Sequence, residues 1–314
     1  MANWKRILLK IAPEEVTFAR RGFASSSREV RDHLENIGRT FVSGYHAALE
    51  WDTSTALTDA LNAIPQENRG FAFEGAAMAL CLLDCLMPWR RSRLDAFLAG
   101  PGADHTYMVH VGAGWALARL KRRVEGPLQR WDPLLGRLAI DGYGFHEGYF
   151  HPQNTIERQE RPGRWSGDAL RVFDQGLGRS LWFVNGADPD RIQATINRFA
   201  PNRHADLWSG VGLACAYAGG GDHAVAEAVR CASGPFLPEL AQGAAFGAKA
   251  RQRADNPADH TETACILFCG MSAADAARVT DAALIDLAPE GAQPAYDIWR
   301  KRIQNRFSAE VVLT

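Results

Sequence analysis

The feature that most constrains the fold of this 314-residue chain is a Gly-x-Gly pair that recurs along it. Three copies follow one another at intervals of 34 residues, and a fourth precedes them by 30 residues. The four copies are Gly112/Gly114, Gly142/Gly144, Gly176/Gly178 and Gly210/Gly212. Single glycines at positions 44, 75 and 243 continue the series more loosely. A period near 34 residues is typical of helix–turn–helix repeats of the tetratricopeptide kind.

The residues around these glycines predict helices. Asp188 is a suitable N-cap with Pro189 at the first helical position, and Ile192, Ile196 and Phe199 follow at helical spacing. Few runs alternate in the way that β-strands require. We therefore predict an all-α fold of stacked helical hairpins, a tetratricopeptide-like array with about 34 residues per unit.

Two glycines inside one helix need a reason, because each costs about 1 kcal/mol relative to alanine. Positions i and i+2 differ by about 200° around the helix axis, so the pair opens opposite sides of the helix. A helix packed between a preceding and a following helix needs to be thin on both sides. The competing interpretation is a dinucleotide-binding Gly-x-Gly-x-x-Gly loop, but Leu181 and Cys215 replace its third glycine and no strand precedes it. We predict close packing and no cofactor.

The residue pattern divides the chain into four segments. Residues 1–40 form a basic amphipathic N-terminal segment. Residues 41–150 and 169–309 form two helical-repeat halves, and residues 151–168 form an inserted polar loop rich in turn residues. We interpret this loop as a lid or a partner contact.

The N-terminal segment carries a candidate docking helix in residues 1–11. Trp4, Ile7, Leu8 and Ile11 share one helical face, with basic side chains beside them. Such a helix is typical of docking on a membrane surface or a protein partner, and a helix that caps the array is the equal alternative. The apolar run is too short for a signal peptide, and no stretch of about 20 apolar residues predicts a membrane span. We expect a cytoplasmic protein with peripheral contact at the inner membrane face.

Charge and cysteine content exclude further classes. The 35 basic and 36 acidic residues leave a net charge of -1, which argues against nucleic acid as a partner. The six cysteines are interpreted as reduced, buried small side chains, since there is no secretory signal and their spacing does not fit a zinc site.

No motif of a known catalytic class occurs, so the candidates for chemistry are single side chains. In residues 142–151, two histidines, a carboxylate and two tyrosines form either an acid–base or metal site or a solvent-facing helix end; they are His146, His151, Glu147, Tyr143 and Tyr149. A third well-spaced ligand is lacking, and we predict no metal. Glu74 lies in an apolar helix and needs a partner, for which Arg69 and Arg179 are the candidates. An ion pair between repeats and a functional acid in a groove are the alternatives.

Aromatic side chains suggest a ligand-binding groove. Trp182 and Trp208 flank glycine-bearing helices, and several phenylalanines accompany them. Such a groove could hold a long apolar ligand such as a polyene, and packing in the core is the alternative.

Three strings, Phe71–Ala79, Gly176–Val184 and Asp206–Ala214, resemble the UnbL-like proteins. These are a bacterial family of unknown function found among enediyne-biosynthesis genes. The resemblance spans most of residues 15–310 and is most specific in Gly-Arg-Ser-Leu-Trp-Phe-Val. It implies a role in enediyne polyketide metabolism, alongside a membrane protein and a predicted propeller protein encoded nearby. It implies no catalytic residues.

Two functions follow as hypotheses. The preferred one is a non-catalytic accessory protein that scaffolds or presents a protein partner or a hydrophobic polyketide intermediate, with homo-oligomerisation left open. The alternative is an enzyme or carrier that acts on a hydrophobic polyene and uses His146, Glu147 and Glu74 as polar groups. A closed apolar tunnel ending on buried carboxylates favours the alternative, and an open concave surface favours the scaffold.

Overall fold

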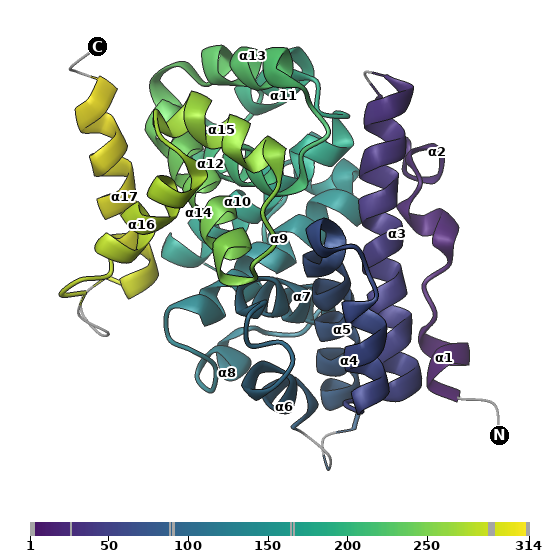
Figure 1. Ribbon diagram of the computed structural model, residues 1–314. Helices are drawn as coiled ribbons and strands as arrows, with labels where there is room; N and C mark the ends of the chain where they lie inside the picture. The colour runs from purple at the N-terminus through teal and green to yellow at the C-terminus, as the bar shows by residue number, and fades with distance from the viewer. Residues whose placement is uncertain are drawn as a thin grey trace.

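The computed structural model describes residues 4–25, 27–87, 89, 92–163, 165, 167–287 and 293–311 (Figure 1). Every regular element within these residues is a helix, which confirms the predicted all-α fold. In the same residues, no helix is both long enough and apolar enough to cross a membrane.

Seven helices of the described chain carry the recurring glycines, and we call them the inner helices. They are α3 (Arg28–Trp51), α5 (Gln66–Leu86), α7 (Thr106–Arg119), α9 (Leu138–Phe150), α10 (Gly167–Val184), α12 (Pro201–Ala218) and α14 (Leu237–Arg253). Each packs mainly against the inner helix before it and the one after it. Helices α5, α7 and α9 are buried over most of their length, as expected for helices that have neighbours on all sides.

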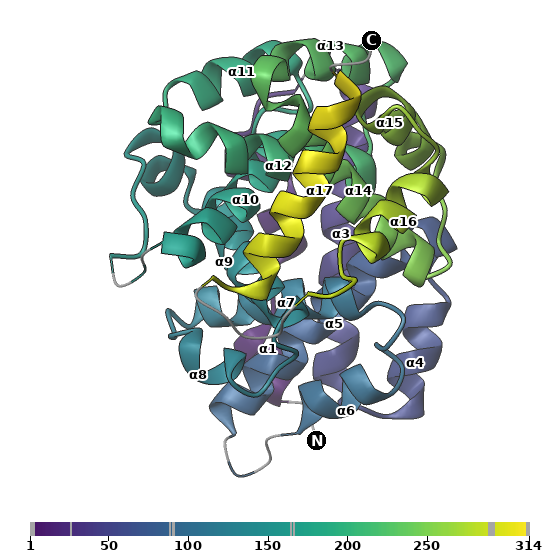
Figure 2. The same ribbon diagram turned by 90° about the vertical axis from the view of Figure 1, so that its left-hand side faces the viewer.

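Shorter helices lie at the periphery (Figures 1 and 2). Those that join inner helices are α4 (Thr55–Asn62), α6 (Arg93–Ala99), α8 (Glu125–Leu128), α11 (Pro189–Asn197) and α13 (His223–Ser233). The N-terminal segment holds α1 (Trp4–Leu9), a 3-10 turn (Pro13–Val16) and α2 (Phe18–Arg21). The chain continues after α14 with α15 (Asp259–Cys269), α16 (Ala273–Ala282) and α17 (Ala295–Val311). A glycine-bearing inner helix with a shorter outer helix is thus the common unit, while tetratricopeptide-type geometry stays a prediction.

The glycine pairs allow the backbones of neighbouring inner helices to approach closely on both sides, as the sequence predicts. A Cβ atom on Gly176 of α10 would collide with the backbone carbonyl of Asp141 in the preceding helix α9. A Cβ atom on Gly178 would collide with the carbonyl of Leu207 in the following helix α12. The pairs in α7, α9 and α12 follow the same rule, the first glycine facing backward and the second forward.

The inner helices curl until the last of them return to the first. Nε2 of His33 in α3 lies 2.7 Å from the carbonyl oxygen of Ala218 at the end of α12. Arg251 of α14 donates a hydrogen bond of 3.2 Å to the carbonyl of Glu67 at the start of α5. The inner helices therefore surround a common interior, whereas an open repeat array would have a concave surface exposed to solvent.

A buried polar side chain precedes the leading glycine in α9, α10, α12 and α14, and we call these residues the polar ladder. They are Asp141, Gln175, Ser209 and Gln242. Gln175 donates to Asp141 over 2.7 Å, and Ser209 donates to Gln242 over 2.9 Å. Helix α17 lies across these helices, and its Arg300 donates to Gln242 over 3.3 Å (Figure 2). Mutual hydrogen bonding makes these polar groups tolerable in the interior.

The helices do not follow two of the segments that the sequence predicts, residues 1–40 and residues 151–168. The boundary between residues 40 and 41 falls inside helix α3. The segment 151–168 contains a π-helical turn (Gln153–Glu157), and its Ile156 and Trp165 are buried, so part of it packs on the core. The ring of Trp165 lies 4.9 Å from that of Tyr143 in α9. A role for the segment as a lid or partner contact stays a prediction.

All six cysteines are free thiols. Cys81, Cys215, Cys265 and Cys269 are buried and Cys85 is partly buried, whereas Cys231 on α13 is exposed. The prediction of buried cysteines is therefore wrong for Cys231, which lies on the outer face of a peripheral helix.

Candidate functional site

The inner helices enclose a cavity of about 40 Å³. Side chains from α3, α5, α7, α9, α10 and α12 line it, and most of them are aromatic or aliphatic. The aromatic ones are Phe41, Phe71, Trp115, Phe145, Tyr149, Phe183 and Tyr217. A smaller cavity of about 20 Å³ shares Arg179, Leu213 and Tyr217 with it. Arg179 is thus the one cation in the walls of both cavities.

Glu74 is the acidic side chain in the wall of the larger cavity. It projects from α5 and is only 2% exposed. Burial raises the pKa of Glu74 to about 8, although Arg179 opposes the shift. At pH 7 the group is therefore mostly a neutral carboxylic acid, which can donate a hydrogen bond into the cavity.

Glu74 does not form the predicted ion pair among the described residues. Arg179 instead pairs with Asp141, which is fully buried, and acts on Glu74 at longer range. Arg69 donates to the backbone carbonyl of Asn62 over 2.9 Å and does not line the cavity. The prediction was wrong because Asp141, one repeat before Arg179, is the closer acid.

Three buried polar atoms in the cavity-lining residues lack a hydrogen-bond partner in the described part of the chain. They are Oε1 of Glu74, Nε1 of Trp115 and the hydroxyl of Tyr217. The indole of Trp115 is near enough to lower the pKa of Glu74 but falls outside hydrogen-bond geometry. Each unsatisfied group costs about 1–3 kcal/mol. The Tyr217 hydroxyl lies against Gly70, which is not part of the cavity wall. The two neighbouring atoms on Glu74 and Trp115 indicate a place for water or for the polar end of a ligand.

The cavity is too small for a long polyene in this conformation. One water needs about 10–15 Å³, so 40 Å³ holds about three. A larger ligand has to displace part of the wall. One part of that wall is Val16, which belongs to residues 13–21, here called the N-terminal strap. The Tyr149 hydroxyl ties the strap to α9 by donating to the Val16 carbonyl over 3.3 Å.

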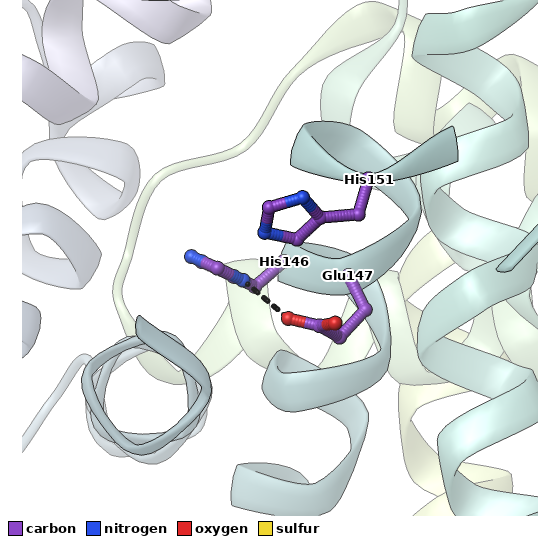
Figure 3. Close-up of side chains that lie close together, drawn as sticks. All are labelled: His146, Glu147 and His151. Atoms are coloured by element: carbon purple, nitrogen blue, oxygen red, sulfur yellow. Dashed lines mark hydrogen bonds and ion pairs between the residues drawn. The ribbon is translucent and has the colours of Figure 1, made fainter. Parts of the chain in front are cut away.

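A second group of candidate residues meets at the end of α9 (Figure 3). Nδ1 of His146 lies 3.0 Å from Oε1 of Glu147, and a ring nitrogen of His151 lies within 4.8 Å of the other two donor atoms. His146 is buried beside the rings of Trp115 and Phe150, and this burial lowers its pKa. His146 and Glu147 do not line the cavity that holds Glu74.

The sequence includes His151 in this candidate group but gives it no recognisable ligand spacing. Its spacing of five residues from His146 does not match one face of an α-helix. Helix α9 ends at Phe150, and His151 has the non-helical angles φ -129° and ψ 48°. This change of direction brings its ring next to the other two.

The tryptophans predicted to bind a ligand or partner do not line the central cavities where the structure describes them. Trp182 is fully buried and donates from its indole nitrogen to the carbonyl of Gly219 over 2.8 Å. Trp208 is 2% exposed. Neither lines the two central cavities, so both are part of the packed core. The side chain of Trp4 lies outside what the structure describes.

An open cleft of about 710 Å³ lies between the ends of α5 and α7, α6 and α8. Its walls include Trp131, the thiols of Cys81 and Cys85, and four basic residues: Lys121, Arg122, Arg123 and Arg130. Sequence reasoning missed it because the whole chain is electrically balanced and the basic residues are split between two short loops. A clustering of positive charge near residues 121–130 was the available signal.

Comparison with protein families gives one match. The family model described as "Protein of unknown function (DUF1702)" matches residues 1–307. No curated protein and no solved structure matches the chain. The protein therefore belongs to this family of proteins of unknown function, DUF1702.

Proposed function

We propose that this protein encloses an apolar small molecule between its inner helices and hydrogen-bonds the polar end of that molecule. The observation that carries the proposal is the presence of two neighbouring unpartnered polar atoms, Oε1 of Glu74 and Nε1 of Trp115, on residues that line one aromatic cavity. Ligand sites in proteins have this character: mostly apolar walls with a few polar groups that fix orientation.

Glu74 gives the site an acid–base capability. With a pKa of about 8, its proton can move to a ligand oxygen and return near neutral pH. The adjacent Arg179 and Asp141 neutralise each other and keep the region free of a net charge. A carrier of an apolar carbonyl compound or alcohol, or an enzyme that transfers a proton to it, fits this arrangement. The resemblance to UnbL-like proteins suggests an enediyne-related polyene as the ligand.

Mass spectrometry after organic extraction of the purified chain tests for a retained ligand. Titration with retinol, a fluorescent polyene alcohol, then tests the site directly. Retinol should bind to the wild type and to Glu74→Gln, which keeps a hydrogen-bonding group. Glu74→Leu has a side chain of similar size but no hydrogen-bonding group. It should bind retinol about tenfold more weakly, which corresponds to about 1.4 kcal/mol of binding free energy.

The control for this titration is Glu227→Gln, because Glu227 is an exposed glutamate on α13. It should bind retinol like the wild type. Absence of both a retained compound and retinol binding, or equal binding by Glu74→Leu, would refute the proposal.

Helix α1 favours a second candidate, an accessory protein that docks on a partner. Ile7 and Leu8 expose 69% and 71% of their surface. Exposed apolar side chains on a basic helix suit a membrane surface or a hydrophobic protein face. Sedimentation with vesicles of anionic phospholipid, and co-purification with a membrane protein encoded nearby, test this candidate. Ile7→Asp should abolish either interaction without changing thermal stability.

A further inference from the structure

We propose that His146, Glu147 and His151 form a binding site for one divalent transition-metal ion, with Zn²⁺ as the best fit. The site is separate from the ligand cavity, and neither proposal depends on the other. Its three donor atoms come from three different environments: His146 is buried, Glu147 is partly buried and His151 is exposed. Figure 3 shows the three side chains gathered at the end of one helix.

The local fold holds these side chains in place. The backbone leaves the helix at His151 and enters the π-helical turn Gln153–Glu157. The hydroxyl of Thr155 donates to the carbonyls of Glu147 and His151 over 3.2 and 3.1 Å. This hydroxyl therefore links the backbone of two of the three proposed ligands. π-Helical turns occur frequently at functional sites.

The donor set matches the chemistry of zinc. Two imidazoles and one carboxylate are the ligands of catalytic zinc sites that keep a fourth position open. Donor atoms bound to one tetrahedral zinc ion lie about 3.3–3.6 Å apart, given zinc–ligand distances of about 2.0–2.2 Å. Nδ1 of His146 and Oε1 of Glu147, 3.0 Å apart, need to separate by only a few tenths of an ångström to reach this spacing. The ring nitrogen of His151 lies within 4.8 Å of the other donor atoms, and its exposed side chain has room to move inward.

The open position has room on the solvent side. His151 also lines a cleft of about 310 Å³, whose other residues include Arg20, Arg21 and Asn154. A metal ion at the triad would bind water or an anionic group at the edge of this cleft. Arg21 is paired with Glu15, which reduces its repulsion of a cation.

The competing explanation is that His146 and Glu147 form a structural hydrogen bond and that His151 lies nearby without a role. The two explanations differ in what His151 does. Because its side chain is exposed, replacing it should not disturb the fold, so His151→Ala is the informative variant. Glu147→Gln is the second one, since it keeps the size and removes the charge.

Zinc binding is measured by isothermal titration with ZnCl₂ after removal of metal by a chelator. A Cys231→Ser background removes the exposed thiol, which could bind zinc elsewhere. We expect one equivalent of zinc in this background, and affinity at least about tenfold lower in His151→Ala and in Glu147→Gln. His223→Ala, which removes an exposed histidine from α13, should bind like the background.

Replacing zinc by Co²⁺ allows the metal ligands to be detected by visible absorption spectroscopy. Co²⁺ bound at the triad should show visible absorption that disappears in His151→Ala. Equal zinc affinity in the His151→Ala and His223→Ala proteins, or no binding in the Cys231→Ser background, would overturn the proposal.

Discussion

The backbone carbonyl of Asp141 occupies the space that a Cβ atom on Gly176 would need. The atom in the way belongs to the backbone of a neighbouring helix, so it cannot rotate aside as a side chain can. The same relationship recurs from one inner helix to the next, which makes the recurring glycines the elements that set the distance between helices.

Gly176→Ala should therefore destabilise the fold by about 3 kcal/mol or more, because one added methyl group must separate two helices. Gly247→Ala should cost less, since the nearest atom to its Cβ is the methyl group of Ala216 at 3.1 Å. Gly126→Ala is the control: it lies in α8 with nothing within 4 Å and should be neutral or slightly stabilising. Urea denaturation measures the series, and equal losses in all three would contradict the explanation.

Glu74→Gln should remove a pH dependence of stability. The pKa of Glu74 rises from 4.5 to about 8 on folding. Between these values the folded state holds a proton that the unfolded state has lost, so stability falls as pH rises, by about 1.4 kcal/mol per pH unit. Below pH 4.5 the carboxyl is neutral in both states and this loss is absent. The free energy of unfolding of both proteins, measured from pH 5 to 8, should diverge in favour of Glu74→Gln, and parallel curves would argue against a neutral Glu74.

Arg300→Met should destabilise the protein by about 3–5 kcal/mol. Arg300 donates to the carboxylate of Asp206 over 2.7 Å, and both side chains are buried, so the variant leaves an uncompensated buried charge. Arg278→Met is the matched control, because its ion pair with Asp275 is exposed and should contribute about 0–1 kcal/mol. Thermal and urea denaturation of the two variants should differ accordingly. Similar losses of stability in the two variants would show that burial of the ion pair does not determine its contribution to stability.

Tyr149→Phe should loosen the N-terminal strap by about 0.5–1.5 kcal/mol, since it deletes only the hydrogen bond to Val16. Faster amide hydrogen exchange in residues 13–21 is the expected result. Tyr296→Phe removes a hydrogen bond that the Tyr296 hydroxyl accepts from Gln175, far from the strap in the sequence, and should leave exchange in the strap unchanged. An unchanged strap in Tyr149→Phe would mean that other contacts hold this wall of the cavity.

The part of the fold that depends on single residues could be predicted from the sequence. A glycine at i and another at i+2 expose the helix backbone on two sides whatever surrounds them, and Gly176 and Gly178 show this. The helix of residues 189–197 was predictable for the same reason, because Asp188 caps its own helix by accepting from the amide of Arg191.

Features that depend on distant contacts could not be predicted. The partner of Arg179 follows from how the helices curl, which no local pattern encodes. The polar ladder recurs every 33–34 residues, but its members are an aspartate, a serine and two glutamines, so a search for a repeated residue type does not find it. His151 joins His146 only because the helix stops at Phe150.

The contact between His33 and Ala218 has a consequence for how this family can change. Open repeat proteins gain or lose whole units during evolution, because each unit contacts only its neighbours. Here α12 meets α3 and α14 meets α5, so removing or duplicating one 34-residue unit would disrupt these closing contacts. The copy number of the repeat is therefore fixed by closure, and variation in size should be confined to the outer helices and the segments that join them.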